Sequence, residues 1–202
     1  ALEIPADLSD DKDVHRVFNE TIKAFNRLDV LVNNAGASVW TNGTADNFLE
    51  ILDKSLAVDV KANLTLIRLF EPHLKQTKGS VVNITAVLTE RPQKGYLAYQ
   101  IAKLGLEMAT TTLALELAPQ GIRVNSVSIG VVRSYAVWDI PEFEKATNNA
   151  IKYTPLGRNA EPIEIAKGVV FLSSSDASFI TGHNLVIDGG LKYNIGSDFL
   201  FK

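Results

Sequence analysis

A tyrosine and a lysine four positions apart, Tyr99 and Lys103, are residues of this sequence whose types and spacing could do chemistry. In a helix, residues at i and i+4 project from the same face, so the two side chains would lie together. A free tyrosine has a pKa of about 10 and is a poor acid–base catalyst at neutral pH, but a neighbouring ammonium stabilises its phenolate form. The pair could therefore exchange a proton with a substrate oxygen while a hydride moves to or from carbon. Taken alone the spacing is a weak signal, because a surface tyrosine beside a solvated lysine has the same pattern.

The elements that must position this pair alternate between short apolar runs and longer amphipathic stretches. Four short runs are typical of strands buried on both faces of a parallel sheet: 30–32, 80–84, 123–127 and 184–187. Four stretches have the apolar spacing of helices, the second of them long enough for one or two: 10–26, 46–76, 96–118 and 161–174. We expect Ser9 to cap the first helix and Glu161-Pro162 to begin the last. The alternation predicts an α/β layer fold with right-handed crossovers.

Composition and charge exclude several classes of protein. The chain has 202 residues, 46% hydrophobic and 21% charged, unlike a disordered tail, a collagenous repeat or a coiled coil. The net charge of −3 favours neither a nucleic-acid surface nor a basic membrane helix, and no apolar run reaches the roughly 18 residues of a membrane span. The absence of cysteine excludes disulfides, thiolate–metal sites and a cysteine nucleophile. We expect one domain over residues 1–202, no metal and, with no targeting signal visible, a cytoplasmic location.

Further short motifs give the tyrosine–lysine pair its context. Asn33-Asn34-Ala35-Gly36 ends the first apolar run, and three segments come after the pair in order: Arg123–Val127, Phe179–Gly182 and Asp188–Gly190. Each short motif alone is a weak signal, but the motifs together in this order are specific to one protein family. Over essentially its whole length the chain resembles the short-chain dehydrogenase/reductase (SDR) family, in particular the 3-oxoacyl-carrier-protein reductases. The resemblance implies a Rossmann-like, doubly wound parallel sheet and an NAD(P)-dependent oxidoreductase acting on a small alcohol or carbonyl substrate.

Carried over to this sequence, the resemblance assigns roles to individual residues. Tyr99 would be the catalytic acid–base, and Lys103 would bind the nicotinamide ribose and tune the tyrosine. The other cofactor-binding positions are Asp7 and Leu8 near the adenine, Asn33, Ala35 and Gly36 beneath the adenosine ribose, and Gly130, Val132 and Ser134 at the nicotinamide carboxamide. Two plainer interpretations stay open: Asp7 as a turn residue at a strand end, and Asn33 as a tie between adjacent strands.

The position of the family's catalytic serine, 13 residues before the tyrosine, is occupied by Ala86. Alanine cannot hydrogen-bond a substrate oxygen, and losing one such donor costs on the order of 100- to 1000-fold in rate. Thr85 could replace the serine only if the strand end bulges, because adjacent strand residues point to opposite faces. Otherwise its hydroxyl belongs to the core. Thr89 is a further candidate.

Asp59 stands where the family has an asparagine whose backbone carbonyl holds a water near the lysine. This role of the backbone carbonyl is retained when the asparagine is replaced by aspartate. However, a carboxylate close to Lys103 would compete for its charge and would raise the pKa of Tyr99. The alternative, that Asp59 forms only a local salt bridge, stays open.

The family's glycine-rich phosphate-binding turn, T-G-x-x-x-G-x-G, has no counterpart in this sequence. Residues 1–9 instead resemble the family's third strand and the beginning of the next segment, so two βα units, about 60 residues, are missing. We expect a strand near 2–6 without its neighbours and a strand at 30–33 on an exposed sheet edge. Three explanations are open: a missing N-terminal segment, which we favour, strands supplied by another chain, or a rearranged sheet. Without the turn, cofactor binding is in doubt and the choice between NAD and NADP is unreadable.

Two main functions therefore stay open. One is a working oxidoreductase whose activity is reduced by the loss of the serine. The other is a pseudoenzyme that keeps the fold for binding or assembly; a truncated chain with no function of its own is a weaker third. The resemblance also implies a homo-oligomer, a dimer or tetramer, paired through the helices at 46–76 and 96–118. Aromatic residues in 134–153, resembling a substrate-covering segment, indicate either an apolar substrate or packing: Trp138, Phe143 and Tyr153.

Overall fold

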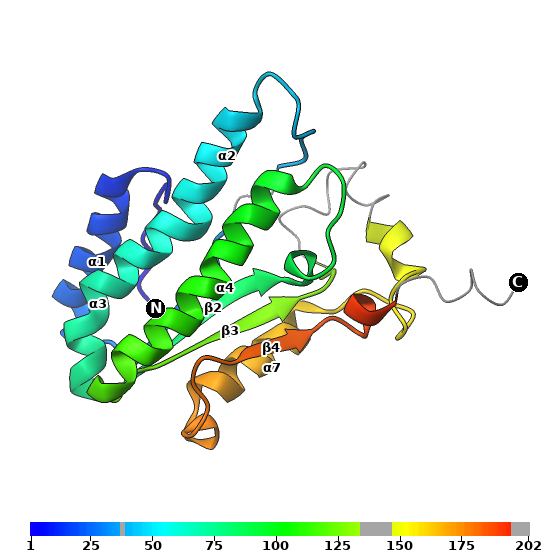
Figure 1. Cartoon of the computed structure of the whole chain (residues 1–202). Helices are drawn as coiled ribbons and strands as arrows, with labels where there is room; N and C mark the ends of the chain where they lie inside the picture. Colours follow the sequence, from blue (N-terminus) through cyan, green and yellow to red (C-terminus); the bar gives the residue numbers. More distant parts are fainter. Residues whose placement is uncertain (37–38, 134–146, 195–202) are drawn as a thin grey trace, which may run out of the picture.

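A four-stranded parallel sheet forms the centre of the molecule (Figure 1). The computed structural model describes residues 1–36, 39–133 and 147–194. The strands are β1 (Val30–Asn33), β2 (Ser80–Ala86), β3 (Arg123–Ile129) and β4 (Asn184–Ile187), and they lie in the order β1-β2-β3-β4. All four predicted strands are confirmed, β1 running one residue and β2 and β3 two residues further than the apolar runs indicated. Within the described residues the sheet therefore keeps the chain order of its strands.

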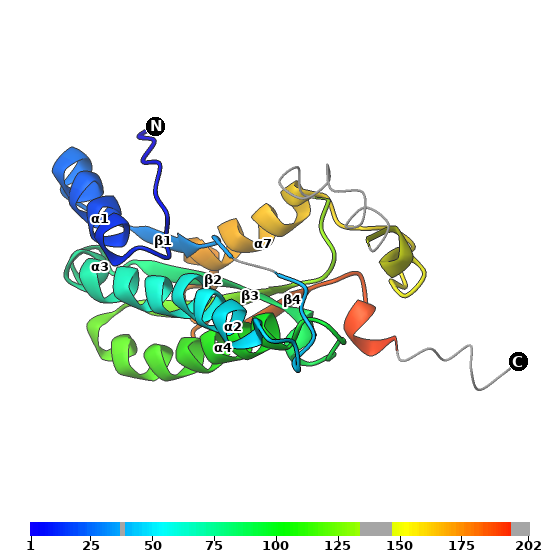
Figure 2. The same cartoon turned by 90° about the horizontal axis from the view of Figure 1, so that it is seen from above.

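Helices cover both faces of this sheet (Figure 2). The longer helices are α1 (Asp11–Phe25), α2 (Phe48–Leu56), α3 (Asn63–Thr77), α4 (Leu97–Leu117) and α7 (Pro162–Ser173). A π-helical segment, η1 (Ala57–Ala62), joins α2 to α3 without a break. Short 3₁₀ segments are η2 (Val87–Thr89), η3 (Ala118–Gln120), η4 (Ser175–Ala177) and η5 (Leu191–Tyr193). The predicted helices are thus confirmed to within two residues at most ends.

Two apolar clusters separate the layers. Because successive strand residues point to opposite faces, Val81 joins the cluster beneath α1, α3 and α4, whereas Val82 joins the one beneath α7. Phe70 of α3 anchors the first cluster, and its ring meets that of Phe18 edge-on at 5.1 Å between centroids. Leu172 of α7 anchors the second. None of the helices in the described parts of the chain is both long and apolar enough to cross a membrane.

Three sequence-based expectations need correction. Residues 1–7 form no strand: a strand needs a neighbour for its hydrogen bonds, and none lies beside this segment in the described structure. The N-cap of α1 is Asp10, whose carboxylate accepts the Lys12 N–H at 2.9 Å, and not Ser9, whose hydroxyl donates to Asp7 instead. Finally, β2 is buried on both faces, but β1 and β4 are not; Val32 is 42% exposed. The position of β1 at one edge of the described sheet is the one expected from the sequence, and β4 forms the other edge.

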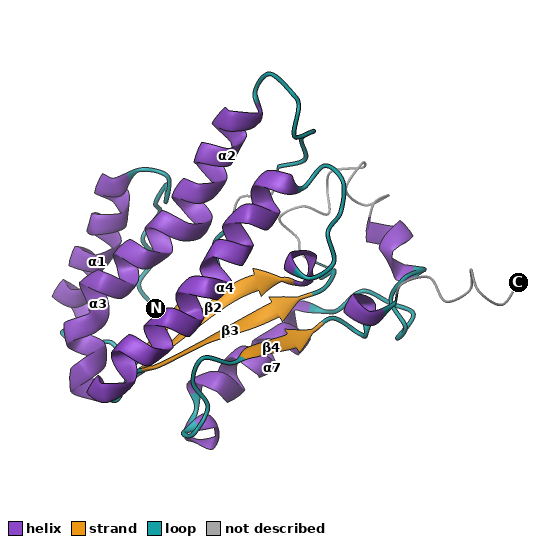
Figure 3. Ribbon diagram, in the orientation of Figure 1, coloured by secondary structure: helices purple, strands orange, loops and turns teal. Residues whose placement is uncertain are grey.

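The arrowheads of β2, β3 and β4 point to the same edge of the sheet (Figure 3), and β1, which pairs with β2 in parallel, has its carboxyl end at that edge too. In open parallel sheets, ligands bind in the crevice at this edge. The N-terminal part of α4 and the segments that come after each strand lie here, so this edge is where the chemistry predicted from the sequence should be sought.

Candidate active site

Helix α4 brings Tyr99 and Lys103 together at the carboxyl end of β2. One helical turn separates the residues, and the Lys103 ammonium lies 5.5 Å from the centre of the Tyr99 ring. Lys103 is almost fully buried and donates a hydrogen bond of 3.0 Å to the backbone carbonyl of Ile84. This contact fixes the lysine against β2. The predicted pairing of the two side chains on one helix face is therefore observed.

Asp59 completes this group from the neighbouring helical segment. Its carboxylate lies 3.0 Å from the Lys103 ammonium, and its side chain is completely buried. Asp59 belongs to the π-helical segment η1, where the Asn63 amide donates 2.8 Å to the Asp59 backbone carbonyl. Of the two outcomes left open for Asp59, the structure therefore gives the direct ion pair with Lys103.

The backbone at Gly36 closes over the ion pair from the end of β1. A Cβ atom on this residue would lie 2.8 Å from the Asp59 carboxylate and 3.2 Å from the Lys103 ammonium, so only glycine fits without a shift. Asn33, three residues earlier, uses its amide to donate 2.8 Å to Asn83 on β2. Asn33 therefore ties the two strands together, as its plainer interpretation held, while Ala35 lies exposed in the turn after β1.

The burial of Tyr99 and the charges of Asp59 and Lys103 determine how readily the Tyr99 hydroxyl ionises. Burial raises the pKa of Tyr99 above the ordinary value for tyrosine, and the negative charge of Asp59 raises it further, with a smaller contribution from Tyr96. Lys103 alone would lower this pKa, but its charge is matched by that of Asp59 at 3.0 Å. In this arrangement the phenol is held in its protonated form at neutral pH.

Thr85 does not join the tyrosine and lysine. Its side chain is completely buried, and its hydroxyl donates a long hydrogen bond, 3.5 Å, to the carbonyl of Val127 on β3. Ala86, the last residue of β2, is also buried. No bulge moves Thr85 into the position of the missing serine, because the register with β3 stays regular to the end of β2.

Glu107 forms a second polar group that the sequence analysis missed. Its carboxylate accepts hydrogen bonds from Thr89 at 2.9 Å and from Asn184 at 3.4 Å, and the Thr85 hydroxyl also contacts it. Burial raises the pKa of Glu107, and these hydrogen bonds oppose the effect. A signal for Glu107 was present, because it lies four residues after Lys103 on the helix face that carries the pair. Thr85 and Thr89 thus belong to this network.

The segment after β3 is held by two neighbours. The Gly130 N–H donates 3.0 Å to the carbonyl of Ile187, and a Cβ on Gly130 would lie 2.8 Å from the backbone of Asp188. Val132 forms an isolated parallel bridge with Ala160. These contacts place the predicted carboxamide-binding segment at the carboxyl edge of the sheet. Ser134 lies outside the described residues.

The predicted adenine-binding residues have local roles in the described structure. The Asp7 carboxylate accepts both the N–H and the hydroxyl of Ser9, at 2.9 and 2.7 Å, and these hydrogen bonds lower its pKa. Leu8 packs against the apolar cluster beneath α1. These contacts are those of a turn residue, one of the two interpretations left open, and the place of Asp7 near an adenine stays a prediction.

Tyr153 is the member of the aromatic segment that the structure describes, since Trp138 and Phe143 lie outside the described residues. Its ring is half exposed and lies 5.6 Å from the guanidinium of Arg91, which lies just after η2. Tyr153 is thereby placed beside the segment that leaves β2. No cluster of three or more potential metal ligands is found among the residues that the structure describes.

Comparison with known proteins agrees with this geometry. Residues 1–192 match the model of a protein family described as enoyl-(acyl carrier protein) reductase. The 3-oxoacyl-[acyl-carrier-protein] reductase FabG of Thermotoga maritima is 34% identical over 190 residues, covering 91% of this chain and 74% of that protein. The L-fucose dehydrogenase of Mus musculus is 32% identical over 204 residues, covering 96% of this chain and 72% of that protein.

A solved structure shares the same arrangement of elements. It is a short-chain dehydrogenase/reductase of unknown function from Caenorhabditis elegans, determined with cofactor. The TM-score is 0.87 at 34% sequence identity, over 96% of this chain and 76% of that one. The similarity therefore extends from sequence to three-dimensional structure.

Proposed function

The chain belongs to the short-chain dehydrogenase/reductase family, and from this premise we propose that it is an NAD(P)-dependent oxidoreductase acting on an alcohol or carbonyl group. The observation that carries the proposal is the position of Tyr99, one helical turn from a buried Lys103 at the carboxyl edge of the sheet. A phenol held beside the site of hydride transfer can give a proton to a carbonyl oxygen or take one from an alcohol.

The described residues fit the nicotinamide end of such a cofactor. Two of the three N–H donors of the Lys103 ammonium face Ile84 and Asp59, which leaves a third donor for a ribose hydroxyl. Gly36 and Gly130 bring bare backbone to the same edge of the sheet. The related C. elegans structure was determined with cofactor, which supports the proposal. The 202 residues contain no glycine-rich turn for the pyrophosphate.

The chemistry divides between the cofactor and the chain. When bound, a reduced nicotinamide supplies a hydride to the carbonyl carbon, and the electron pair of the C=O π bond moves to oxygen. The Tyr99 hydroxyl then donates its proton to that oxygen, giving the alcohol, and regains a proton from solvent. Lys103 would hold the ribose, and because Asp59 matches its charge it would stabilise the transient phenolate only weakly. Ala86 offers this oxygen no second hydrogen bond, so we propose a slow rate for the reaction.

Ala86 and the Lys103–Asp59 ion pair also favour a second candidate, a catalytically inactive protein that keeps the fold for binding or assembly. Titration with NADH and NADPH, monitored by the fluorescence of the two tryptophans, tests the proposal. We expect a saturable change with at least one of them. No change with either would overturn the oxidoreductase proposal, whereas binding without turnover of any carbonyl would favour the inactive protein.

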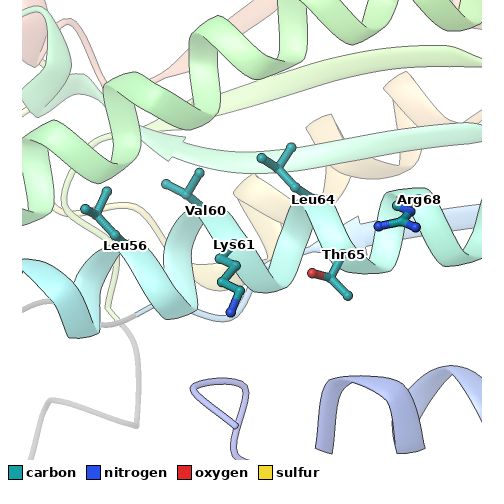
Figure 4. Close-up of a pocket in the computed structure, with 6 residues that line it drawn as sticks. All are labelled: Leu56, Val60, Lys61, Leu64, Thr65 and Arg68. Carbon is teal, nitrogen blue, oxygen red and sulfur yellow. The ribbon is translucent and has the colours of Figure 1, made fainter. Parts of the chain in front are cut away.

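A homodimer formed through α4 and its neighbouring helix is also part of the proposal. Leu56, Val60 and Leu64 line a shallow groove, and their side chains point to the same side of the helix, away from Lys61 (Figure 4). On α4, four apolar side chains with helical spacing are 40–80% exposed: Ile101, Leu104, Met108 and Leu115. Each of these two adjacent helices thus exposes a stripe of apolar side chains. A second copy of the same chain could pack against both helices and would bury the two stripes.

A further inference from the structure

The buried pair of Lys103 and Asp59 determines how much positive charge reaches the tyrosine. The two side chains are 3% and 0% exposed, and their charged atoms are 3.0 Å apart. Water and salt screen such a pair weakly. Because the charges are opposite and nearly in contact, the field that they produce at Tyr99 is that of a dipole and not that of a cation.

Within the described residues, the charges that act on Tyr99 are those of Asp59 and Tyr96, and the lysines of the neighbouring elements, Lys54 on α2 and Lys61 on η1, are not among them. On α4 the titratable neighbours are Tyr96 and, two turns along, Glu107, whose carboxylate is engaged by Thr89 and Asn184. The segment η1 contributes Asp59, and the end of β2 contributes the neutral Ala86. Gly36 covers the pair from the end of β1 with uncharged backbone.

We propose that Asp59 is a positioning residue that withholds the charge of Lys103 from Tyr99, keeps the phenol protonated, and so moves the pH range of alcohol oxidation upward. This inference rests on the proposed oxidoreductase function. Reduction needs the phenol as a proton donor, whereas oxidation needs the phenolate to accept the alcohol proton as the hydride leaves carbon for the oxidised nicotinamide. A phenol that is hard to ionise therefore makes oxidation depend on high pH, and as a weaker acid it also slows reduction, because the two directions share one transition state.

The direct test is the ionisation of Tyr99, measured by the near-ultraviolet absorbance of phenolate. The chain has five tyrosines, so the difference between the wild-type protein and Tyr99→Phe isolates the signal of this one. In the wild-type protein we expect Tyr99 to ionise above the ordinary tyrosine value of 10.0. Ionisation at or below that value in the wild-type protein would overturn the inference, even if no variant of Asp59 folds.

The variant Asp59→Asn removes the negative charge and keeps the shape of the side chain. We expect about tenfold or more phenolate at a given pH, as for other single charges close to a titrating group. Asp53→Asn is the matched control, because it removes the same charge from an exposed position on α2, and it should leave the titration unchanged. An Asp59→Asn titration that coincides with that of the wild-type protein would contradict the proposal.

Kinetics give a second readout and separate this inference from the proposed function. In Asp59→Asn, kcat/KM for alcohol oxidation at neutral pH should rise about tenfold or more, and its pH profile should break at a lower pH. At the same pH, kcat/KM for reduction should rise by a comparable factor, because the two directions share one transition state. If Tyr99→Phe abolishes turnover but Asp59→Asn leaves both pH profiles unmoved, the inference fails and the proposed function stands. If the wild-type protein turns over no carbonyl or alcohol, the proposed function fails, and the absorbance titration still decides the effect of Asp59.

Discussion

The ammonium of Lys103 lies between the carboxylate of Asp59 and the backbone carbonyl of Ile84, at 3.0 Å from each. Residues 59 and 103 are far apart in the sequence, and they meet because η1 packs beside α4 at the carboxyl end of β2. The ion pair fixes the lysine 5.5 Å from the centre of the Tyr99 ring, so we expect its disruption to affect both the stability of the fold and the proposed chemistry.

Removing one partner of this pair should destabilise the fold strongly. Lys103→Met leaves the buried carboxylate without its cation, which typically costs about 3–5 kcal/mol in the free energy of unfolding. The double variant Lys103→Met/Asp59→Asn should recover part of this loss, because no unmatched charge remains buried. Urea unfolding of the two single variants and the double variant measures the coupling. Strictly additive losses would show that the two residues do not interact as described.

Gly36→Ala should perturb the site without changing any charge. The new Cβ would meet the Asp59 carboxylate at 2.8 Å, so the ion pair or the turn must shift, at a cost of about 1–3 kcal/mol. Gly105→Ala on α4 is the matched control, because its Cβ would meet only Val60, at 3.8 Å, and should stabilise the helix by up to about 1 kcal/mol. Thermal unfolding compares the two. Equal stability of both variants would contradict the close packing at Gly36.

Two substitutions at the end of β2 test whether the hydrogen-bond donor of the family's serine is absent or is supplied by Thr85. Ala86→Ser should raise the rate of carbonyl reduction by up to on the order of 100-fold, because it restores a hydrogen bond to the reacting oxygen. Thr85→Val should leave kcat within about twofold, since the hydroxyl faces Val127 and Glu107 and not the tyrosine. Steady-state kinetics of both variants provide the check. A loss of about 100-fold or more in Thr85→Val would make Thr85 the substitute for the serine.

The proposed dimer depends on the exposed apolar stripe of α4. Met108→Glu places a charge in the middle of this stripe, where the native side chain is 66% exposed. It should convert a dimer into a monomer, as measured by light scattering after size-exclusion chromatography. Leu2→Glu, a similar change in the N-terminal segment, should leave the mass unchanged. A wild-type protein that is already monomeric would contradict the proposed interface.

The fold could be predicted from the sequence where a pattern reflects burial. The run 80–84 has apolar residues on both faces, and β2 is indeed buried on both. The prediction failed at 2–6, because resemblance to the family's third strand does not make a strand where no neighbouring strand is present to share its hydrogen bonds. Ser9 and Asp10 are both good N-caps, and the choice between them depends on the backbone angle at which α1 begins.

The site could be predicted only in part, because its partners are distant in the sequence. The i, i+4 spacing indicated Tyr99 and Lys103, since helix geometry is local. The contact of Asp59 with Lys103 depends on the packing of η1 against α4, so the sequence left two outcomes open. Glu107 was missed although it continues the same helix face, because a carboxylate there is equally typical of a solvated surface charge.

The oxidoreductase proposal is tested most directly by the turnover of carbonyl substrates with NADH or NADPH in the wild-type protein and in Tyr99→Phe. The exchange removes one hydroxyl and keeps the ring beside Lys103, so folding and cofactor binding should be retained. We predict measurable reduction by the wild-type protein and a loss of at least about 100-fold in kcat for the variant. Turnover that is equal in the two proteins would contradict the role of Tyr99, and the absence of turnover in the wild-type protein with every carbonyl tested would contradict the proposed function.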